Sequence, residues 1–245
     1  MRTSRVLGAT AAAVLVHGAP GLTAVAPIRR RLARVAPVLA GRGRPGHLAL
    51  TFDDGPDPAS TPSFLDALDR LGWHATFFML GSLAAVAPGL VDEVVAAGHE
   101  IAVHGHHHVN HLARTPWAVN EDIKRAGSTL AEITGRAPRW LRPPYGVLSG
   151  ATVGAAGREN LGVVLWSAWG RDWTESATPT GVADLVESQL AALTGRSGPT
   201  VLLHDSDCTS APGSWRSGAG ALGVLAERWA GRYEVGTVSE HFAPA

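Results

Sequence analysis

The chain of 245 residues is poor in several residue types, and each scarcity limits what the protein can be. Cys208 is the only cysteine, which excludes an internal disulfide and leaves the redox compartment open. No Asp or Glu precedes Asp53, whereas eight of the 21 basic side chains do, which leaves 13 basic against 21 acidic side chains in the rest of the chain. An acidic body argues against nucleic acid as the main partner.

Residues 1–46 form a basic extension that is rich in alanine and arginine. The apolar run at 6–16 and the Ala-Val-Ala sequence at 24–26 resemble a signal peptide and its cleavage site, although Pro27 would follow the cut. The run is also shorter than the roughly 20 residues that span a bilayer. The sequence therefore leaves two alternatives open: export or surface anchoring, and a cytoplasmic extension that lies against the membrane or the domain.

Residues 47–245 are expected to form one α/β domain. Short apolar runs alternate with helical patterns about seven times, which predicts a parallel sheet, either open or closed into a barrel. Strands are expected near 48–52, 75–80, 100–103, 139–141, 162–166, 200–203 and 233–238, and helices near 61–71, 82–97, 115–135, 179–194 and 214–229.

Polar side chains follow the predicted strands at their C-terminal ends. In a β/α barrel these ends meet at one mouth, where active sites are built. The residues expected to converge there are Asp53, Asp54, His104, Arg142, Asp172 and His204.

Asp53 and Asp54 end the first strand as two adjacent carboxylates. Neighbouring side chains of an extended chain point to opposite faces, so the two carboxylates take different directions. One can hold a metal while the other faces substrate or water. The alternative is a turn in which the following glycine and proline merely end the strand.

His104 and His108 lie four residues apart in the run His-Gly-His-His-His. One helical turn or a tight loop would bring both imidazoles to one side. With Asp54 they make a two-histidine, one-carboxylate set, which suits zinc or another divalent ion and leaves positions open for water and substrate. The alternative is a solvated loop that happens to be rich in histidine. His106 and His107 are expected to support the site from outside or to be exposed.

Five motifs occur in order along the domain: Thr51–Pro56, the pair His104 and His108, Arg142–Gly146, Asp172–Trp173 and Leu202–His204. In this combination the chain resembles the polysaccharide deacetylase family, which is carbohydrate esterase family four, over about residues 48–238. The resemblance implies a distorted β/α barrel of about seven parallel strands with the active site at their C-terminal ends. It also implies metal-dependent removal of acetyl groups from N-acetylated sugars.

The resemblance further implies catalytic roles. Asp53 is expected to be the general base, with Arg142 pairing with it and orienting it. His204 is expected to be the general acid, and Asp172 would support Arg142 or the acid. The expected metal ligands are Asp54, His104 and His108.

Substrate contacts are implied in the same way. The backbone amide of Tyr145 would help to hold the oxyanion, and Leu202 would line the acetyl pocket. Four tryptophans are candidates for stacking on sugar rings, with core packing as the alternative for each: Trp140, Trp166, Trp169 and Trp173.

Two positions depart from the family pattern. The family has Ser or Thr after the first metal histidine, where its hydroxyl steadies the loop, and this chain has Gly105. The family also has an Asp three residues before its Asp-Trp pair, and this chain has Trp169. Activity is expected to survive because Asp172 is present, but the wall of the groove must differ.

The expected function is the removal of N-acetyl groups from N-acetylglucosamine glycans such as chitin oligomers or peptidoglycan. The expected cofactor is Zn²⁺, with Co²⁺ or Mn²⁺ as alternatives. An O-acetyl esterase or a small-molecule amidohydrolase could use the same site, and a non-catalytic glycan-binding protein is the third alternative. The partner is a glycan, membrane association through the extension stays open, and the oligomeric state is not predicted.

Overall fold

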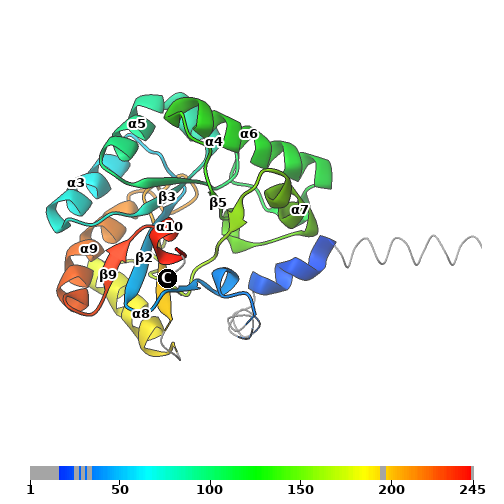
Figure 1. Cartoon of the computed structure of the whole chain (residues 1–245). Coiled ribbons are helices and arrows are strands. Elements are labelled where there is room, and N and C mark those ends of the chain that lie inside the picture. Colours follow the sequence, from blue (N-terminus) through cyan, green and yellow to red (C-terminus); the bar gives the residue numbers. More distant parts are fainter. Residues whose placement is uncertain (1–16, 25–27, 29–30, 32–34, 194–196, 244–245) are drawn as a thin grey trace, which may run out of the picture.

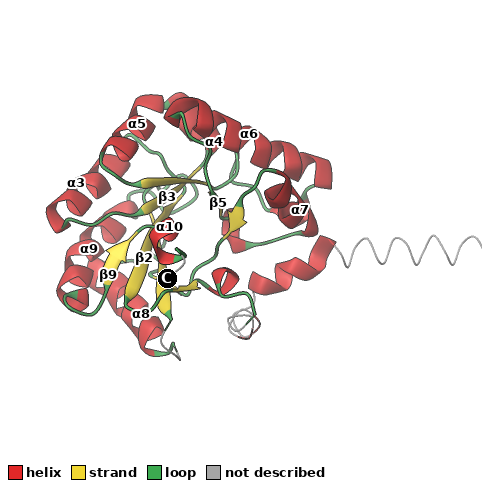
Figure 2. Cartoon of the chain, in the orientation of Figure 1, coloured by secondary structure: helices red, strands yellow, loops and turns green. Residues whose placement is uncertain are grey.

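A computed structural model describes residues 17–24, 28, 31, 35–193 and 197–243. Strands lie inside and helices surround them as an outer layer (Figures 1 and 2). The signal-like run at 6–16 lies outside the described residues. Within the described part of the chain, no helix is long and apolar enough to cross a membrane.

The sheet follows the order β7-β8-β2-β3-β4-β5-β6, and all these strands pair in parallel. The strands are β1 (Arg42–Gly43), β2 (His47–Asp53), β3 (Thr76–Met79), β4 (Glu100–Val103), β5 (Trp140–Leu141), β6 (Gly162–Val163), β7 (Ala168–Trp169), β8 (Gly198–His204) and β9 (Glu234–Gly236). Strand β9 pairs with the start of β2, and β1 runs antiparallel to β8. Among the described residues no ladder joins β6 to β7, so the barrel is open there, and the predicted distorted barrel is confirmed.

The helices largely follow the predicted positions. They are α3 (Thr61–Leu71), α4 (Gly81–Val86), α5 (Pro88–Ala96), α6 (Pro116–Thr134), α7 (Gly150–Arg158), α8 (Pro179–Ala191), α9 (Trp215–Trp229) and α10 (Val238–His241), with short 3-10 turns η1 (Ala19–Ala24), η2 (Val38–Ala40), η3 (His111–Ala113) and η4 (Pro144–Gly146). Helix α6 begins as expected, because the Thr115 hydroxyl accepts a hydrogen bond from the amide of Ala118 and Pro116 fills the first turn.

Two predictions about elements were wrong, and two helices were not predicted. The single helix expected at 82–97 is two helices, because Pro88 disfavours helical geometry at Ala87, whose φ and ψ are −126° and 55°. Helix α7 was not predicted, because its buried face is made of small residues such as Ala155 and Ala156 rather than a stripe of large apolar ones. The short helix α10 was missed, and the strand expected at 162–166 is only the two residues of β6.

The core forms where the inner strands meet the helices. Phe52 on β2 packs against Phe64 of α3 and Phe77 of β3, with ring centroids 5.0 Å apart in both pairs. All three side chains are fully buried, and burying each contributes about 1.5–3 kcal/mol. Strand β2 is buried along its whole length, which holds its carboxyl end in a fixed position.

Candidate active site

The predicted site residues converge at the carboxyl ends of the strands. Asp53 is the last residue of β2, and its register partner on β8 is His204. His104 follows β4, Arg142 follows β5 and Asp172 follows β7. The parallel sheet therefore brings together residues that are up to about 150 positions apart in the sequence.

Asp54, His104 and His108 form the only group of three or more potential ligands found among the described residues, with ligand atoms within 4.8 Å of one another. Asp54 Oδ1 lies 3.2 Å from Nε2 of His104 and 3.3 Å from Nε2 of His108. The Nδ1 atom of His104 lies 2.8 Å from the carbonyl oxygen of Arg142. A hydrogen bond from Nδ1 to that carbonyl leaves Nε2 as the free ligand atom.

The cluster fits a divalent cation. Asp54 Oδ1 is buried and accepts no hydrogen bond from any residue that the structure describes. Burial raises the pKa of Asp54, but the adjacent His104, with His204 and His108, outweighs it and holds the pKa well below its ordinary value. Burial, aided by the charge of His104, lowers the pKa of His108 to about 4, so its imidazole is neutral at pH 7. One carboxylate and imidazole nitrogens are donors that suit zinc and similar ions.

Asp53 is held by Arg142. The Arg142 Nη1 atom donates to Asp53 Oδ1 at 2.7 Å and to the hydroxyl of Thr51 at 2.8 Å. The guanidinium is fully buried and stacks over the ring of Phe78, 4.1 Å from its centroid. The other oxygen of Asp53 lies 3.8 Å from His104 Nε2, so this carboxylate adjoins the metal cluster without belonging to it.

His204 is paired with Asp172. Asp172 Oδ1 lies 3.0 Å from Nδ1 of His204, and Oδ2 accepts the backbone N–H of the same residue at 2.7 Å. Burial lowers the pKa of His204, but Asp172 outweighs burial and raises it to about 9. Of the two partners that the sequence left open for Asp172, the structure selects His204, because both carboxylate oxygens are bonded to it.

The expected substrate contacts lie around these pairs. Tyr145 is 57 % exposed, has a left-handed backbone with φ 60°, and packs its ring against His108 with centroids 4.4 Å apart. Leu202 is buried in an apolar cluster with Trp166. Trp169 and Trp173 are half-buried with centroids 4.7 Å apart, and Trp173 contacts His204 edge to face.

Trp140 lies elsewhere. Its indole N–H donates to the hydroxyl of Ser239 on α10 at 2.9 Å, and its ring packs against Phe242. The packing alternative therefore holds for Trp140. Trp166 is also buried, and of the two half-buried tryptophans Trp173 is the one whose ring contacts His204.

Sequence reasoning did not identify two residues that hold the site together. Thr209, from the polar loop after β8, donates its hydroxyl to Asp54 Oδ2 at 2.6 Å. Asp205 is buried and accepts the hydroxyl of Thr61 at 2.6 Å, and burial raises its pKa to about 7. The length and polarity of the loop signal that it lies near the mouth, but nothing in the sequence indicates which hydroxyl reaches Asp54.

Comparisons with known proteins find a matching family model and related sequences. The family model of polysaccharide deacetylase matches residues 40–164, and Asp172 and His204 lie beyond the matched part. A chitooligosaccharide deacetylase of Bradyrhizobium sp. is 40% identical over 157 residues, which are 64% of this chain and 69% of that protein. The peptidoglycan-N-acetylmuramic acid deacetylase PdaC of Bacillus subtilis is 35% identical over 67% of this chain, and the match spans only 33% of PdaC.

Among solved structures, a family 4 carbohydrate esterase from Streptomyces lividans in complex with acetate is similar over most of the fold. It covers 76% of this chain and 88% of that chain, with a TM-score of 0.65 and 30% sequence identity. The matched family model spans the first three of the five motifs. The chain belongs to the polysaccharide deacetylase family.

Proposed function

We propose that the chain is a metal-dependent hydrolase that removes N-acetyl groups from N-acetylglucosamine units of a glycan such as chitin oligomers or peptidoglycan. The observation that supports this most directly is the meeting of two hydrogen-bonded pairs beside one cluster of metal-binding side chains. Asp53 is paired with Arg142, and His204 is paired with Asp172. The similar proteins include a chitooligosaccharide deacetylase and a peptidoglycan-N-acetylglucosamine deacetylase, whose names give these glycans as their substrates.

The metal ligands would be Asp54, His104 and His108. A bound divalent ion would polarise the carbonyl of the acyl group and make water at the site more acidic. Zn²⁺ is the ion we propose, with Co²⁺ or Mn²⁺ as substitutes, because one carboxylate and two imidazoles form a common catalytic zinc set. Thr209 would keep the second oxygen of Asp54 away from the ion by hydrogen bonding to it.

Asp53 would remove a proton from the attacking water. Arg142 favours this role because it fixes one oxygen of Asp53 at 2.7 Å and leaves the other free to face the attacking water. His204 would donate a proton to the departing amine, since its pKa of about 9 keeps it protonated at neutral pH. The backbone N–H of Tyr145 would stabilise the negative charge that develops on the carbonyl oxygen.

The acyl group would lie against Leu202, and Trp173 would pack against the sugar. We assign these functions to a catalytic domain at 47–245, with 1–46 as an extension. The end of the extension forms strand β1, which pairs with β8 of the catalytic domain.

Acetate release from N-acetylglucosamine oligomers tests the proposal. Protein treated with a chelator should be inactive, and added Zn²⁺, Co²⁺ or Mn²⁺ should restore release. Acetylated xylan in parallel separates an O-acetyl esterase from an N-deacetylase. Tight metal binding without acetate release from any oligomer would contradict the proposed reaction, and oligomer binding without turnover would favour a glycan-binding protein.

A further inference from the structure

The segment that carries the two metal-binding histidines is not a helix. Residues 104–108 are irregular, and Gly105 has a φ of +98°, which L side chains rarely adopt. Helical hydrogen bonds therefore do not hold the imidazoles of His104 and His108 on one side. Contacts with other elements must hold the two imidazoles together.

Backbone amides of helix α4 bind the carbonyl groups of this segment. The backbone N–H of Gly81 donates to the carbonyl of Gly105, and that of Ser82 donates to the carbonyl of His106, both at 3.0 Å. These donors belong to the first turn of α4, where N–H groups have no partner within the helix.

Asp122 on α6 holds the same segment by its amides. Asp122 Oδ2 accepts the N–H of His106 at 2.8 Å, and Oδ1 accepts the N–H of His107 at 3.1 Å. One carboxylate thus binds two consecutive amides that lie between the two ligands. Hydrogen bonds to a charged acceptor are about twice as strong as neutral ones.

Gly105 makes room for this carboxylate. A Cβ atom at this position would lie 2.9 Å from Asp122 Oδ2, closer than packed carbon and oxygen atoms approach. A serine or threonine here would therefore compete with Asp122 for the same space. The glycine at 105 and the carboxylate at 122 therefore depend on each other, because the glycine leaves the space that the carboxylate fills.

We propose that Asp122 is a positioning residue for the metal site. It binds the amides of His106 and His107 and thereby fixes the positions of His104 and His108 relative to each other. The inference rests on the proposed function only in that these two histidines bind the ion. It requires neither a particular substrate nor turnover.

The first test is Zn²⁺ affinity of the full chain, measured by calorimetry on chelator-treated protein. Asp122→Ala should weaken Zn²⁺ binding by about 10–100-fold, the usual effect of removing a group that orients a metal ligand. Asp122→Asn, which keeps one acceptor oxygen, should show a smaller loss. The matched control is Glu121→Ala, an exposed carboxylate on the same turn of α6, which should leave the affinity unchanged.

The absorption spectrum of the Co²⁺-loaded protein gives a second readout, because it reports the geometry of the ligands rather than stability. Asp122→Ala should change the spectrum, and Glu121→Ala should not. Wild-type Zn²⁺ affinity and spectrum in Asp122→Ala would overturn the inference and leave the proposed function intact. Failure of the unmodified chain to bind Zn²⁺ would overturn both.

A double-variant experiment tests the pairing of positions 105 and 122. Gly105→Ser should weaken Zn²⁺ binding in the unmodified chain, because its side chain collides with Asp122. In the Asp122→Ala background the same change should cost at least several-fold less affinity. Equal losses in both backgrounds would show that only the backbone at 105 matters and would refute the shared arrangement.

Discussion

Histidines lie near both ends of strand β2, and the two groups differ in their partners. At the carboxyl end, His104 adjoins the carboxylates of Asp53 and Asp54, and His204 is bonded to Asp172. At the amino end, His47 faces His241 of α10, with their Nδ1 atoms 3.0 Å apart.

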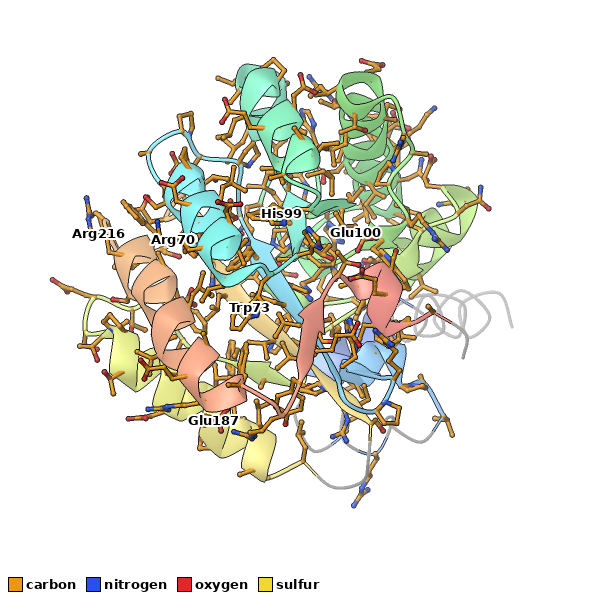
Figure 3. All side chains as sticks on the ribbon, turned by 60° about the vertical axis from the view of Figure 1, so that its left-hand side comes forward. Arg70, Trp73, His99, Glu100, Glu187 and Arg216 are labelled. Carbon is orange, nitrogen blue, oxygen red and sulfur yellow. The ribbon has the colours of Figure 1, made fainter. Side chains whose placement is uncertain are left out.

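The surroundings of the amino end are polar, but the carboxylates there are used by other groups. Figure 3 shows Glu100 beside α10, where it accepts the amide of Ser239 at 3.1 Å and the hydroxyl of Thr76 at 2.7 Å. Glu240 accepts the amide of Thr237 at 2.7 Å in a capping box. Among the described residues, no carboxylate is hydrogen-bonded to His47 or His241.

The difference in partners gives the histidines at the two ends different protonation states. Burial, helped by the charge of His47, lowers the pKa of His241 to about 3, so the pair is neutral. At His204 the carboxylate of Asp172 outweighs burial and raises the pKa to about 9. Burial lowers the pKa of both histidines, and the carboxylate beside His204 decides that this imidazole is protonated while that of His241 is neutral.

The largest effect is expected from Asp53→Asn at the carboxyl end. Loss of the proposed general base should lower kcat by about 10²–10⁴-fold, while Zn²⁺ affinity stays within a few-fold because the three proposed ligands remain. Acetate release and calorimetry measure the two quantities. Asp66→Asn, an exposed carboxylate on α3, is the control, and a wild-type rate for Asp53→Asn would show that the base lies elsewhere.

Asp172→Asn should make His204 resemble the amino-end histidines. Without the carboxylate the pKa of His204 falls from about 9, so the protonated form, and with it kcat, should be lost at lower pH. At pH 8 we expect a loss of about 10²-fold, with a smaller loss near pH 6. The alkaline limb of the pH profile of kcat measures this. An unchanged limb would show that Asp172 does not control the protonation of the group that acts as the acid.

Thr209→Val should have a smaller effect. The valine keeps the shape of the side chain but removes the hydroxyl that holds Asp54 Oδ2, so Zn²⁺ affinity should fall by about 10-fold. Calorimetry measures the Zn²⁺ affinity of Thr209→Val. The control is Thr174→Val, since the hydroxyl of Thr174 bonds to a backbone carbonyl. Equal affinities in both variants would mean that the loop leaves Asp54 unaffected.

The smallest effect is expected from His241→Gln at the amino end, and it concerns stability alone. The folded-state pKa of His241 lies below its unfolded value of 6.5, so the unfolded chain binds the proton first as pH falls. Stability that this group contributes at pH 7 is therefore lost from about pH 6.5 downward, by about 1.4 kcal/mol per pH unit for one proton.

In His241→Gln the free energy of unfolding should depend less steeply on pH between 6.5 and 4, with kcat unchanged. Urea unfolding of metal-free protein at several pH values measures the slope. The exposed His74→Gln is the control, and a slope equal to that of the unmodified chain would show that His241 does not titrate on unfolding.

Much of the site could be predicted because its residues follow directly from short apolar strands. Asp53, His104 and His204 stand at or just after the ends of β2, β4 and β8, where a parallel sheet must bring them together. The partner of Asp172 could not be predicted, since the sequence places Arg142 and His204 at the same mouth and does not show that β7 pairs with β8 rather than with β5. The break before Pro88 has a sequence signal in the proline, but α7 has no strong apolar period to reveal it.

The sequence by itself determined the family, the order of the strands and helices along most of the chain, and the residues available for catalysis. These properties depend on local patterns: apolar runs, turn residues and motifs that each lie within about six positions. Only the tertiary structure decided the charge of each histidine and the shape of the segment from His104 to His108. Those properties depend on carboxylates and amides that α4, α6 and the segment after β7 bring from distant positions, such as Asp122 and Asp172.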